Sequence, residues 1–478
     1  MKMKKLLFIR YIILFFVISA NFSCSKDFVN LTPEGLIPVD GYYHDELSIK
    51  NALTGMYGSL RTIYNNHWAY SELPSDNTMT YPSSEAFWGE MDKYTWVSTS
   101  TRIQEAWSRH YTTISLSNII LDRIDPVPMQ QTNKDRYIAE AKFVRALMYF
   151  NLVRMFGDVP LVLNEITTEA QAYSYNREPI ARVYAQIEKD LTEAAAVLPT
   201  SYTSADFGRP TQNAAKGLLG KVYMFQKKFT EAETILAQVV AAAPSPLVPF
   251  DKIFGPGNDN NGDILFSVQY ITGGFGEGNI FAREFVPQPS GTTIIGVSGS
   301  SYNVGGVDLY DAFEPGDARK PISIDIFMDG SLPYYYTRKF LYPTVPAGNE
   351  GDNDWPVLRF GDVILLYAEA LNENHKTNEA LVQLNRIRTR AGLPDKTGLS
   401  EQDARTAIYN ERRVELCFEG ERWFDLVRWN IFIPTMQAFK TKYNVTGMGN
   451  IEERLKVFPI PSRERALNPN LTQNTGYE

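Results

Sequence analysis

The sequence predicts a mainly α-helical protein: a scaffold of tetratricopeptide-like helical hairpins, with an inserted irregular region carrying a few short strands. Three observations support this fold class. Residues 214–244 carry small, aromatic and proline residues at the spacing of a tetratricopeptide hairpin. Other segments show an apolar helical period, whereas residues 245–356 are rich in glycine and lose it. One hairpin cannot bury its apolar faces alone, so we expect neighbouring hairpins.

The first 40 residues have the pattern of an export signal. Four basic residues precede the apolar run 11–18, and small or polar residues then lead to Cys24. The run is too short to predict a membrane-spanning helix. We therefore expect residues 1–23 to be a lipoprotein signal peptide, Cys24 to be lipidated, and residues 24–40 to form a lipid-anchored tether. An ordinary signal peptide with an incidental cysteine is the alternative.

Composition and motifs exclude several classes of function. The formal charge is −8, and it becomes four units more negative without residues 1–23. This acidity, together with the lack of a basic cluster, argues against nucleic acid as a partner. The histidines lack ligand spacing, and no nucleophile elbow, phosphate loop or dinucleotide fingerprint occurs, so we expect no metal, no cofactor and no catalytic residues.

Residues 41–244 form the predicted N-terminal helical part. The apolar period predicts helices over 45–64, 101–124, 133–156 and 179–198, before the hairpin at 214–244. Within that hairpin, Gly220 and Ala232 let the helices approach closely, and Pro244 prevents the second helix from continuing. The long aromatic segment 65–99 is predicted to be an irregular loop, and loops of this length are usually functional.

The remaining chain divides into the irregular region 245–356 and a C-terminal helical part, 357–478. Strands are expected at 264–271 and 334–342, where apolar and aromatic residues cluster between turn residues. Helices are then expected at 361–372, 377–390, 401–418 and 423–429, followed by an extended tail. We expect all these parts to form one folded unit.

The segment 411–429 is dense in arginine and carboxylates. Paired carboxylates can serve as general acid and base in glycosidases. Each carboxylate here has an arginine within three or four positions on the same predicted helix. Guanidinium groups lower carboxylate pKa values, which is the wrong direction for a general acid. The segment therefore predicts a structural network of ion pairs.

The aromatic loops are the candidate binding segments. The flat faces of sugars pack well on tryptophan and tyrosine rings, while Asp, Asn and Arg side chains hydrogen-bond to hydroxyls. The alternative is that many of these rings pack beneath the loops that carry them. The candidate ligand-binding residues are Trp68, Tyr70, Asp76, Asn77, Tyr81, Trp88, Tyr334, Tyr335, Arg338 and Trp355.

Five blocks of sequence together resemble the SusD (RagB/SusD) family of bacterial outer-membrane nutrient-uptake lipoproteins. The blocks span nearly the whole chain after the signal and stand in the family's order. They are CSKDFVNLTPEG from residue 24, AEAKFVRALMYFNLVRMFGDVPLV from 140, RFGDVILLYAEALNE from 359, ERRVELCFEGERWFDLVRW from 411 and FPIPSRERALNPNLTQNTGY from 458.

The resemblance implies a surface-exposed lipoprotein that is not an enzyme. Such a protein captures an oligosaccharide and delivers it to a partner TonB-dependent, SusC-like transporter in the outer membrane, facing the cell exterior. The alternatives are an oligopeptide cargo in the same role, a lipid-anchored glycoside hydrolase, and a helical scaffold that binds only proteins.

Overall fold

The computed structural model describes residues 39–478, except 82–84, 204–205, 260, 275 and 343–349. The described chain is mainly helical with a few short strands, which confirms the predicted fold class. The predicted signal peptide and Cys24 lie outside the described residues. Within the described part, no helix is both long enough and apolar enough to span a membrane.

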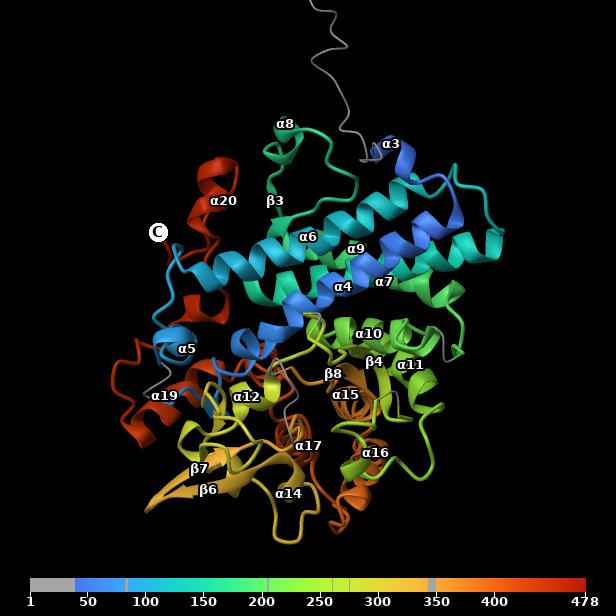
Figure 1. Cartoon of the computed structure of the whole chain (residues 1–478). Coiled ribbons are helices and arrows are strands. Elements are labelled where there is room, and N and C mark those ends of the chain that lie inside the picture. Colours follow the sequence, from blue (N-terminus) through green and yellow to red (C-terminus); the bar gives the residue numbers. More distant parts are fainter. Residues whose placement is uncertain (1–38, 82–84, 204–205, 260, 275, 343–349) are drawn as a thin grey trace, which may run out of the picture.

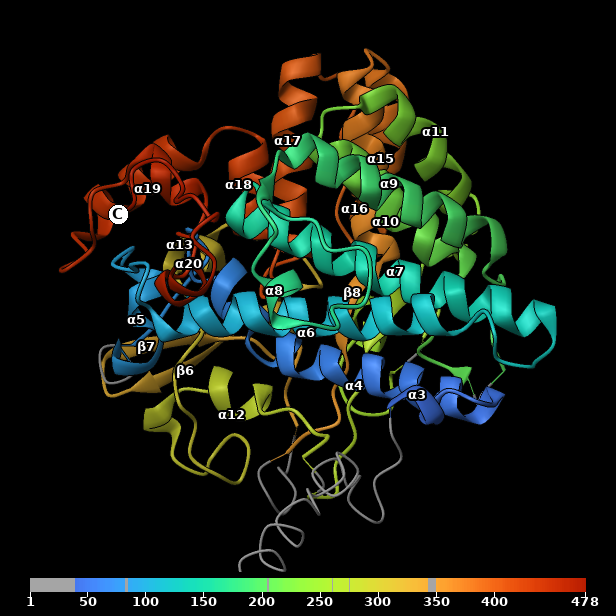
Figure 2. The same ribbon diagram turned by 90° about the horizontal axis from the view of Figure 1, so that it is seen from above.

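The N-terminal part is a layer of long helices packed in sequence order (Figures 1 and 2). Helix α4 packs against α6, α6 against α7, and α7 against α9. At the start of α4, the Asp45 carboxylate accepts a hydrogen bond from the Ser48 N–H at 2.8 Å, which caps the helix. The helices of this part are α3 (Val39–Tyr42), α4 (Glu46–Ser71), α5 (Glu85–Asp92), α6 (Thr101–Arg123), α7 (Gln131–Phe156), α8 (Glu169–Ala172) and α9 (Ile180–Val197).

Helix α4 is longer than predicted, and this corrects the expected loop at 65–99. No glycine or proline follows Gly58 until Pro74, so the helix continues to Ser71 and includes Trp68 and Tyr70. Helix α5 occupies a further part of the same segment. The segment is therefore half helical, and much of its aromatic content belongs to the core.

The tetratricopeptide-like hairpins are present where the sequence predicts them. Helices α10 and α11 pack together, α15 packs against α16, and α11 packs against α15, so the two hairpins bury each other's apolar faces. Gly220 is the close-approach residue, because a Cβ built there would lie 2.3 Å from Leu236 Cδ2. The helices are α10 (Gln212–Phe225), α11 (Phe229–Val240), α15 (Phe360–Glu373), α16 (Thr377–Arg390) and α17 (Glu401–Glu415).

Substituting Gly220 tests this close packing. Gly220→Ala is expected to lower the free energy of unfolding by about 1–3 kcal/mol, because Leu236 must move to admit the methyl group. Gly55→Ala, in the middle of α4 with no atom within 4 Å of the new Cβ, is the matched control. The control should gain about 0.5–1 kcal/mol from helix propensity. Urea denaturation of both variants measures the difference, and effects of the same sign would contradict the close-approach role.

The inserted region contains most of the strands. A four-stranded antiparallel sheet has the order β1-β5-β7-β6, while β2 pairs with β3 and β4 pairs with β8. The predicted strand 334–342 is shorter and begins earlier, as β7, which pairs with β6 through Tyr334 opposite Phe327. The strands are β1 (Thr78–Met79), β2 (Val159–Pro160), β3 (Arg177–Glu178), β4 (Ile264–Val268), β5 (Val304–Gly305), β6 (Asp325–Asp329), β7 (Leu332–Tyr336) and β8 (Trp355–Arg359).

Short helices complete the inserted region and the C-terminal part. One apolar core joins all three parts, since it includes Leu53, Phe285 and Leu365. The tail over 458–478, which was expected to be extended, contains α20. The remaining helices are η3 (Phe250–Lys252), α12 (Phe281–Phe285), η4 (Gln288–Ser290), α13 (Val307–Asp311), α14 (Lys320–Ser323), α18 (Arg422–Arg428), α19 (Phe432–Tyr443), η5 (Glu453–Lys456) and α20 (Ser462–Leu467).

Candidate ligand-binding site

Five of the predicted binding rings are buried, so the structure does not place them on a ligand surface. Each has at most 4% of its surface exposed. Trp68 packs edge-to-face against Trp88 and Phe285, with ring centroids 5.5 and 5.2 Å apart. A ring enclosed in this way cannot offer a face to a sugar. The five residues are Trp68, Tyr70, Trp88, Tyr334 and Trp355.

Asp76 and Asn77 are also buried, and they join the loop after α4 to the C-terminal helices. Asp76 accepts hydrogen bonds from Arg422, at 2.7 Å, and is paired with Arg413 at 3.0 Å. Asn77 Oδ1 accepts from Arg413 Nε at 2.8 Å. Burial acts to raise the pKa of the Asp76 carboxyl, but the two guanidinium groups outweigh it and hold that pKa below its usual range. Both side chains therefore have structural partners in place of a ligand.

Tyr335 and Arg338 are accessible. Successive side chains on a strand point to opposite faces, so Tyr335 lies on the other face of β7 from Tyr334. Its ring packs against Tyr310, with centroids 5.1 Å apart. The exposed Arg338 pairs with Asp325 at 3.5 Å.

The accessible aromatic surface is formed by residues from three separate segments. Phe87, on α5, is 51% exposed and packs against Tyr302, with ring centroids 5.2 Å apart. Tyr81 packs on Tyr334, with centroids 4.6 Å apart. The Tyr81 N–H donates to the Ser301 carbonyl at 3.2 Å, which brings the two ring pairs together. We call Tyr81, Phe87 and Tyr302 the aromatic shelf, and the buried ring of Tyr334 packs behind Tyr81.

The hairpin of β6 and β7 supports the shelf, because its residue Tyr334 packs behind Tyr81. Leu332 is exposed and points to the same face of β7 as Tyr334, because the two are separated by two positions. Gly330 in the two-residue turn has a φ of +61°, a conformation that side chains disfavour. The turn residue thus fixes the register of β6 and β7, which sets Tyr334 opposite Phe327.

Two members of the shelf, Phe87 and Tyr302, were not among the predicted binding residues. On α5, Trp88 points inward and its neighbour Phe87 points outward. Because the two are adjacent, the sequence alone does not tell which of the rings is accessible. Tyr302 is a lone aromatic residue in a Ser/Gly-rich stretch of the inserted region. This isolation is the sequence feature that could have marked it as a binding candidate.

A buried carboxyl lies beneath the shelf. Glu284, on α12, is 5% exposed and its carbonyl accepts a hydrogen bond from the Tyr302 N–H at 2.8 Å. Its Oε2 atom has no hydrogen-bond partner among the described residues. Burial raises the pKa of the Glu284 carboxyl to about 8, although Trp68 and the charges of Arg102 and Arg283 act in the opposite direction. Near neutral pH this carboxyl is therefore protonated.

The raised pKa of Glu284 predicts how stability changes with pH. The folded protein keeps a proton that the unfolded chain loses above pH 4.5, so the free energy of unfolding falls by up to about 1.4 kcal/mol per pH unit between pH 4.5 and 8. Glu284→Gln keeps the neutral form, and we expect a shallower decline and a more stable protein at pH 8. Urea denaturation at several pH values measures this, with the exposed Glu231→Gln as control. Parallel pH profiles for the two variants would contradict it.

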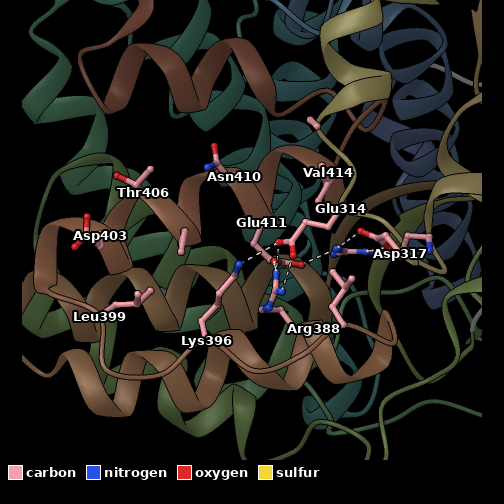
Figure 3. Close-up of a pocket in the computed structure, with 14 residues that line it drawn as sticks. Glu314, Asp317, Arg388, Lys396, Leu399, Asp403, Thr406, Asn410, Glu411 and Val414 are labelled. Carbon is pink, nitrogen blue, oxygen red and sulfur yellow. Dashed lines mark hydrogen bonds and ion pairs between the residues drawn. The ribbon is translucent and has the colours of Figure 1, made fainter.

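The pocket in Figure 3 is lined by charged side chains, unlike the aromatic shelf. It has a volume of about 240 Å³ and opens between α17, the end of α16 and the loop before α14. Arg388 donates hydrogen bonds to the carboxylates of Glu314, at 2.8 Å, and Glu411, at 3.0 Å. Arg319 pairs with Glu411 and Asp317 at 2.6 and 2.7 Å. Since these charges neutralise one another, the pocket is an open edge of the scaffold's ion-pair network.

The arginine-rich segment 411–429 does form ion pairs, but most of its partners lie elsewhere in the fold. Buried Glu415 pairs with Arg319 at 3.0 Å, with Arg359 at 2.5 Å and with Arg390. Asp425 and Arg428, 2.8 Å apart, do have the predicted spacing of three residues. The pKa of the Glu415 carboxyl lies well below its ordinary value, because three guanidinium groups outweigh the effect of burial.

The ion pairs of this segment connect the main parts of the molecule. Glu419 pairs with Lys339, which follows β7, at 2.6 Å. Arg412 pairs with Asp362 on α15 at 2.8 Å. Together with the Arg422–Asp76 pair, these contacts fix the inserted region, a hairpin and the loop after α4 to the C-terminal helices. Among the residues that the structure describes, no group of three or more His, Cys, Asp and Glu side chains is arranged to hold a metal ion.

Comparison with known proteins agrees with the fold. Residues 31–224 match a family profile described as starch-binding associating with outer membrane, and residues 323–477 match the profile of the SusD family. The two profiles leave residues 225–322 between them, and this stretch includes Tyr302. They define an outer-membrane-associated class of protein on a helical-repeat scaffold. The chain belongs to the SusD family, as its sequence blocks predicted.

Similar proteins cover nearly the whole chain. SusD-like protein P25 of Formosa agariphila is 26% identical, over 98% of this chain and 99% of that protein. The starch-binding protein SusD of Bacteroides thetaiotaomicron is 23% identical, over 89% of this chain and 87% of that protein. The solved structure of a laminarin binding SusD-like protein is 27% identical, with a TM-score of 0.79, over 91% of this chain and all of that one.

Proposed function

We propose that this protein binds an oligosaccharide on the aromatic shelf and releases it chemically unchanged. The observation that carries the proposal is the shelf itself, where Phe87 is exposed and Tyr302 and Tyr81 are half-buried, so all three retain accessible ring surface. Sugar rings pack on such surfaces through their apolar faces. Two relatives support the ligand class, since one is named starch-binding and another laminarin binding.

Membership of the SusD family supports a proposal about the partner and the location. We propose that the ligand passes to a SusC-like TonB-dependent transporter, with the protein facing the cell exterior on a lipid anchor at Cys24. Co-purification of a large outer-membrane transporter with the tagged full-length protein tests the partnership. The mass of the N-terminal peptide tests the anchor, because acylation of Cys24 adds the mass of its acyl chains. Recovery of unmodified Cys24 would contradict the anchor.

A panel of ligands tests the binding proposal. Native affinity gels containing starch or laminarin should retard the purified protein. Calorimetry against an oligopeptide mixture tests the alternative cargo, for which the shelf would line a peptide groove. Binding of peptides but of no glycan would replace the carbohydrate proposal with the peptide one.

A glycoside hydrolase is the second candidate, and Glu284 is the observation that favours it. Its raised pKa is the direction that a general acid needs, and it lies under the shelf. A general acid must also reach the glycosidic oxygen, however, and Glu284 is buried. We therefore expect no release of reducing sugar from starch or laminarin. Release that disappears in Glu284→Gln would establish the hydrolase.

A further inference from the structure

A second aromatic groove lies on a different part of the molecule from the shelf. It has a volume of about 350 Å³ and is enclosed by α6, the segment around α8, and α20. These elements lie in the upper part of Figure 1, whereas the β6–β7 hairpin lies at the lower edge. The volume falls within the usual range for small-ligand sites, about 300–1,000 Å³.

Four aromatic rings line the groove. Trp107 and Tyr111 lie one turn apart on α6, with ring centroids 5.0 Å apart. Tyr173 and Tyr175 come from the segment after α8 and face the groove from the other side. Trp107 is buried as part of the wall, and the three tyrosines are half-buried, so they retain exposed ring surface.

The groove is held in shape by hydrogen bonds that do not involve a ligand. The Tyr111 hydroxyl donates to the Pro160 carbonyl at 2.8 Å, which fixes the ring on its helix. Asn468 Nδ2 donates to the Tyr175 carbonyl at 2.7 Å. A ligand would therefore meet rings already in place, which lowers the entropy cost of binding.

The charges of the lining restrict the chemistry of its ligand. Among the described residues that line the groove, none is a lysine or arginine, so a phosphate or carboxylate ligand would find no counter-charge. The lining carboxylate, Glu464, accepts a hydrogen bond from Gln104 at 2.5 Å. Ser108, Thr112 and Ser115 also line the groove. The Ser108 and Thr112 hydroxyls donate to backbone carbonyls of α6, so each oxygen can still accept a hydrogen bond from a ligand. A neutral ligand with flat apolar faces and hydroxyl groups at its edges fits this lining, and a pyranose ring has that form.

We propose that this groove is a second, separate carbohydrate-binding site that holds a single sugar ring. It shares its ligand class with the proposed function but depends on different residues. Two sites on one molecule raise the effective concentration of a long glycan at each site, so a polysaccharide held at the groove dissociates less readily from the shelf.

Saturation-transfer NMR with methyl β-D-glucopyranoside and methyl β-D-galactopyranoside, at up to ~10 mM, tests the groove. We expect transfer to at least one glycoside, and about two- to tenfold weaker binding in Tyr173→Ala and in Tyr175→Ala. Thr112→Trp, on the exposed face of α6, should fill the groove and abolish this binding without removing a core contact. Circular dichroism checks that each variant is folded.

A double variant that disables the shelf, Phe87→Ala/Tyr302→Ala, separates this inference from the proposed function. Binding of the glycosides to this variant, lost when Thr112→Trp is added, supports the groove. Binding that is lost in the shelf variant and unchanged by Thr112→Trp overturns the second site and leaves the proposed function standing. No transfer to either glycoside also overturns the second site, and affinity gels with laminarin then report on the shelf alone.

Discussion

The Phe87→Ala/Tyr302→Ala variant is expected to bind laminarin or starch about 5- to 150-fold more weakly than the unmodified protein. Each ring contributes about 0.5–1.5 kcal/mol when a sugar face packs on it, and both rings are accessible. Removing the two together also removes their contact with each other, so the shelf loses its flat surface. Affinity gels and calorimetry with the glycan that binds best measure the change.

The matched control for this experiment is Phe207→Ala. Phe207 is also about half exposed but lies in another groove, beside Arg209 and Phe266, away from the shelf. It should leave the affinity within about twofold of the unmodified protein. An unchanged affinity in the folded double variant would remove the shelf as the binding site. A loss in Phe207→Ala would move the site to that groove.

Glu415→Gln is expected to lower the free energy of unfolding by about 3–5 kcal/mol. Glu415 is buried and pairs with Arg319, Arg359 and Arg390, so the neutral amide leaves excess positive charge away from water. Each arginine keeps another partner, since Arg359 pairs with Glu419 at 2.7 Å, Arg319 with Asp317 at 2.7 Å and Arg390 with Asp263 at 3.2 Å. All three nevertheless lose the carboxylate that they share. Chemical denaturation at neutral pH measures the loss.

An exposed ion pair provides the comparison for Glu415. Glu178 and Arg182 lie 2.9 Å apart at the surface, and Glu178→Gln should cost no more than about 0.5 kcal/mol. The effect of Glu415→Gln should also persist in high salt, because screening acts weakly on buried charges. A loss below about 1 kcal/mol would show that segment 411–429 does not hold the parts of the fold together.

The sequence predicted those helices whose own residues show an apolar helical period or a close-packing pattern. The hairpin at 214–244 was recognisable because Gly220, Tyr223 and Phe229 must have those sizes for the two helices to meet. The extension of α4 to Ser71 was missed, although the absence of a breaker before Pro74 indicated it. The first residues of the predicted loop 65–99 therefore belong to this helix.

The residues of the aromatic shelf lie in the two segments that the sequence singled out, 65–99 and 245–356. Two of these residues, Phe87 and Tyr302, were not among the predicted binding residues. Trp68 and Trp355 have the ring chemistry of a binding residue, yet each packs against aromatic rings of the core, Phe285 and Phe340. Tyr81 retains accessible surface on the shelf, whereas Tyr334, which packs against it, is buried. Ring chemistry alone does not tell whether a ring lies in a core or on a binding surface, because both environments stabilise it.

By itself, the sequence determined the helical scaffold and the family, since helix periods, small residues at close approaches and block order are local properties. The tertiary structure alone decided which rings face solvent and which charges pair. Trp88 turns inward because Trp68 and Arg102 cover it, and Glu415 is neutralised by three guanidinium groups from distant segments. Burial and ion pairing depend on what the fold brings alongside a residue, and that information is spread over the whole chain.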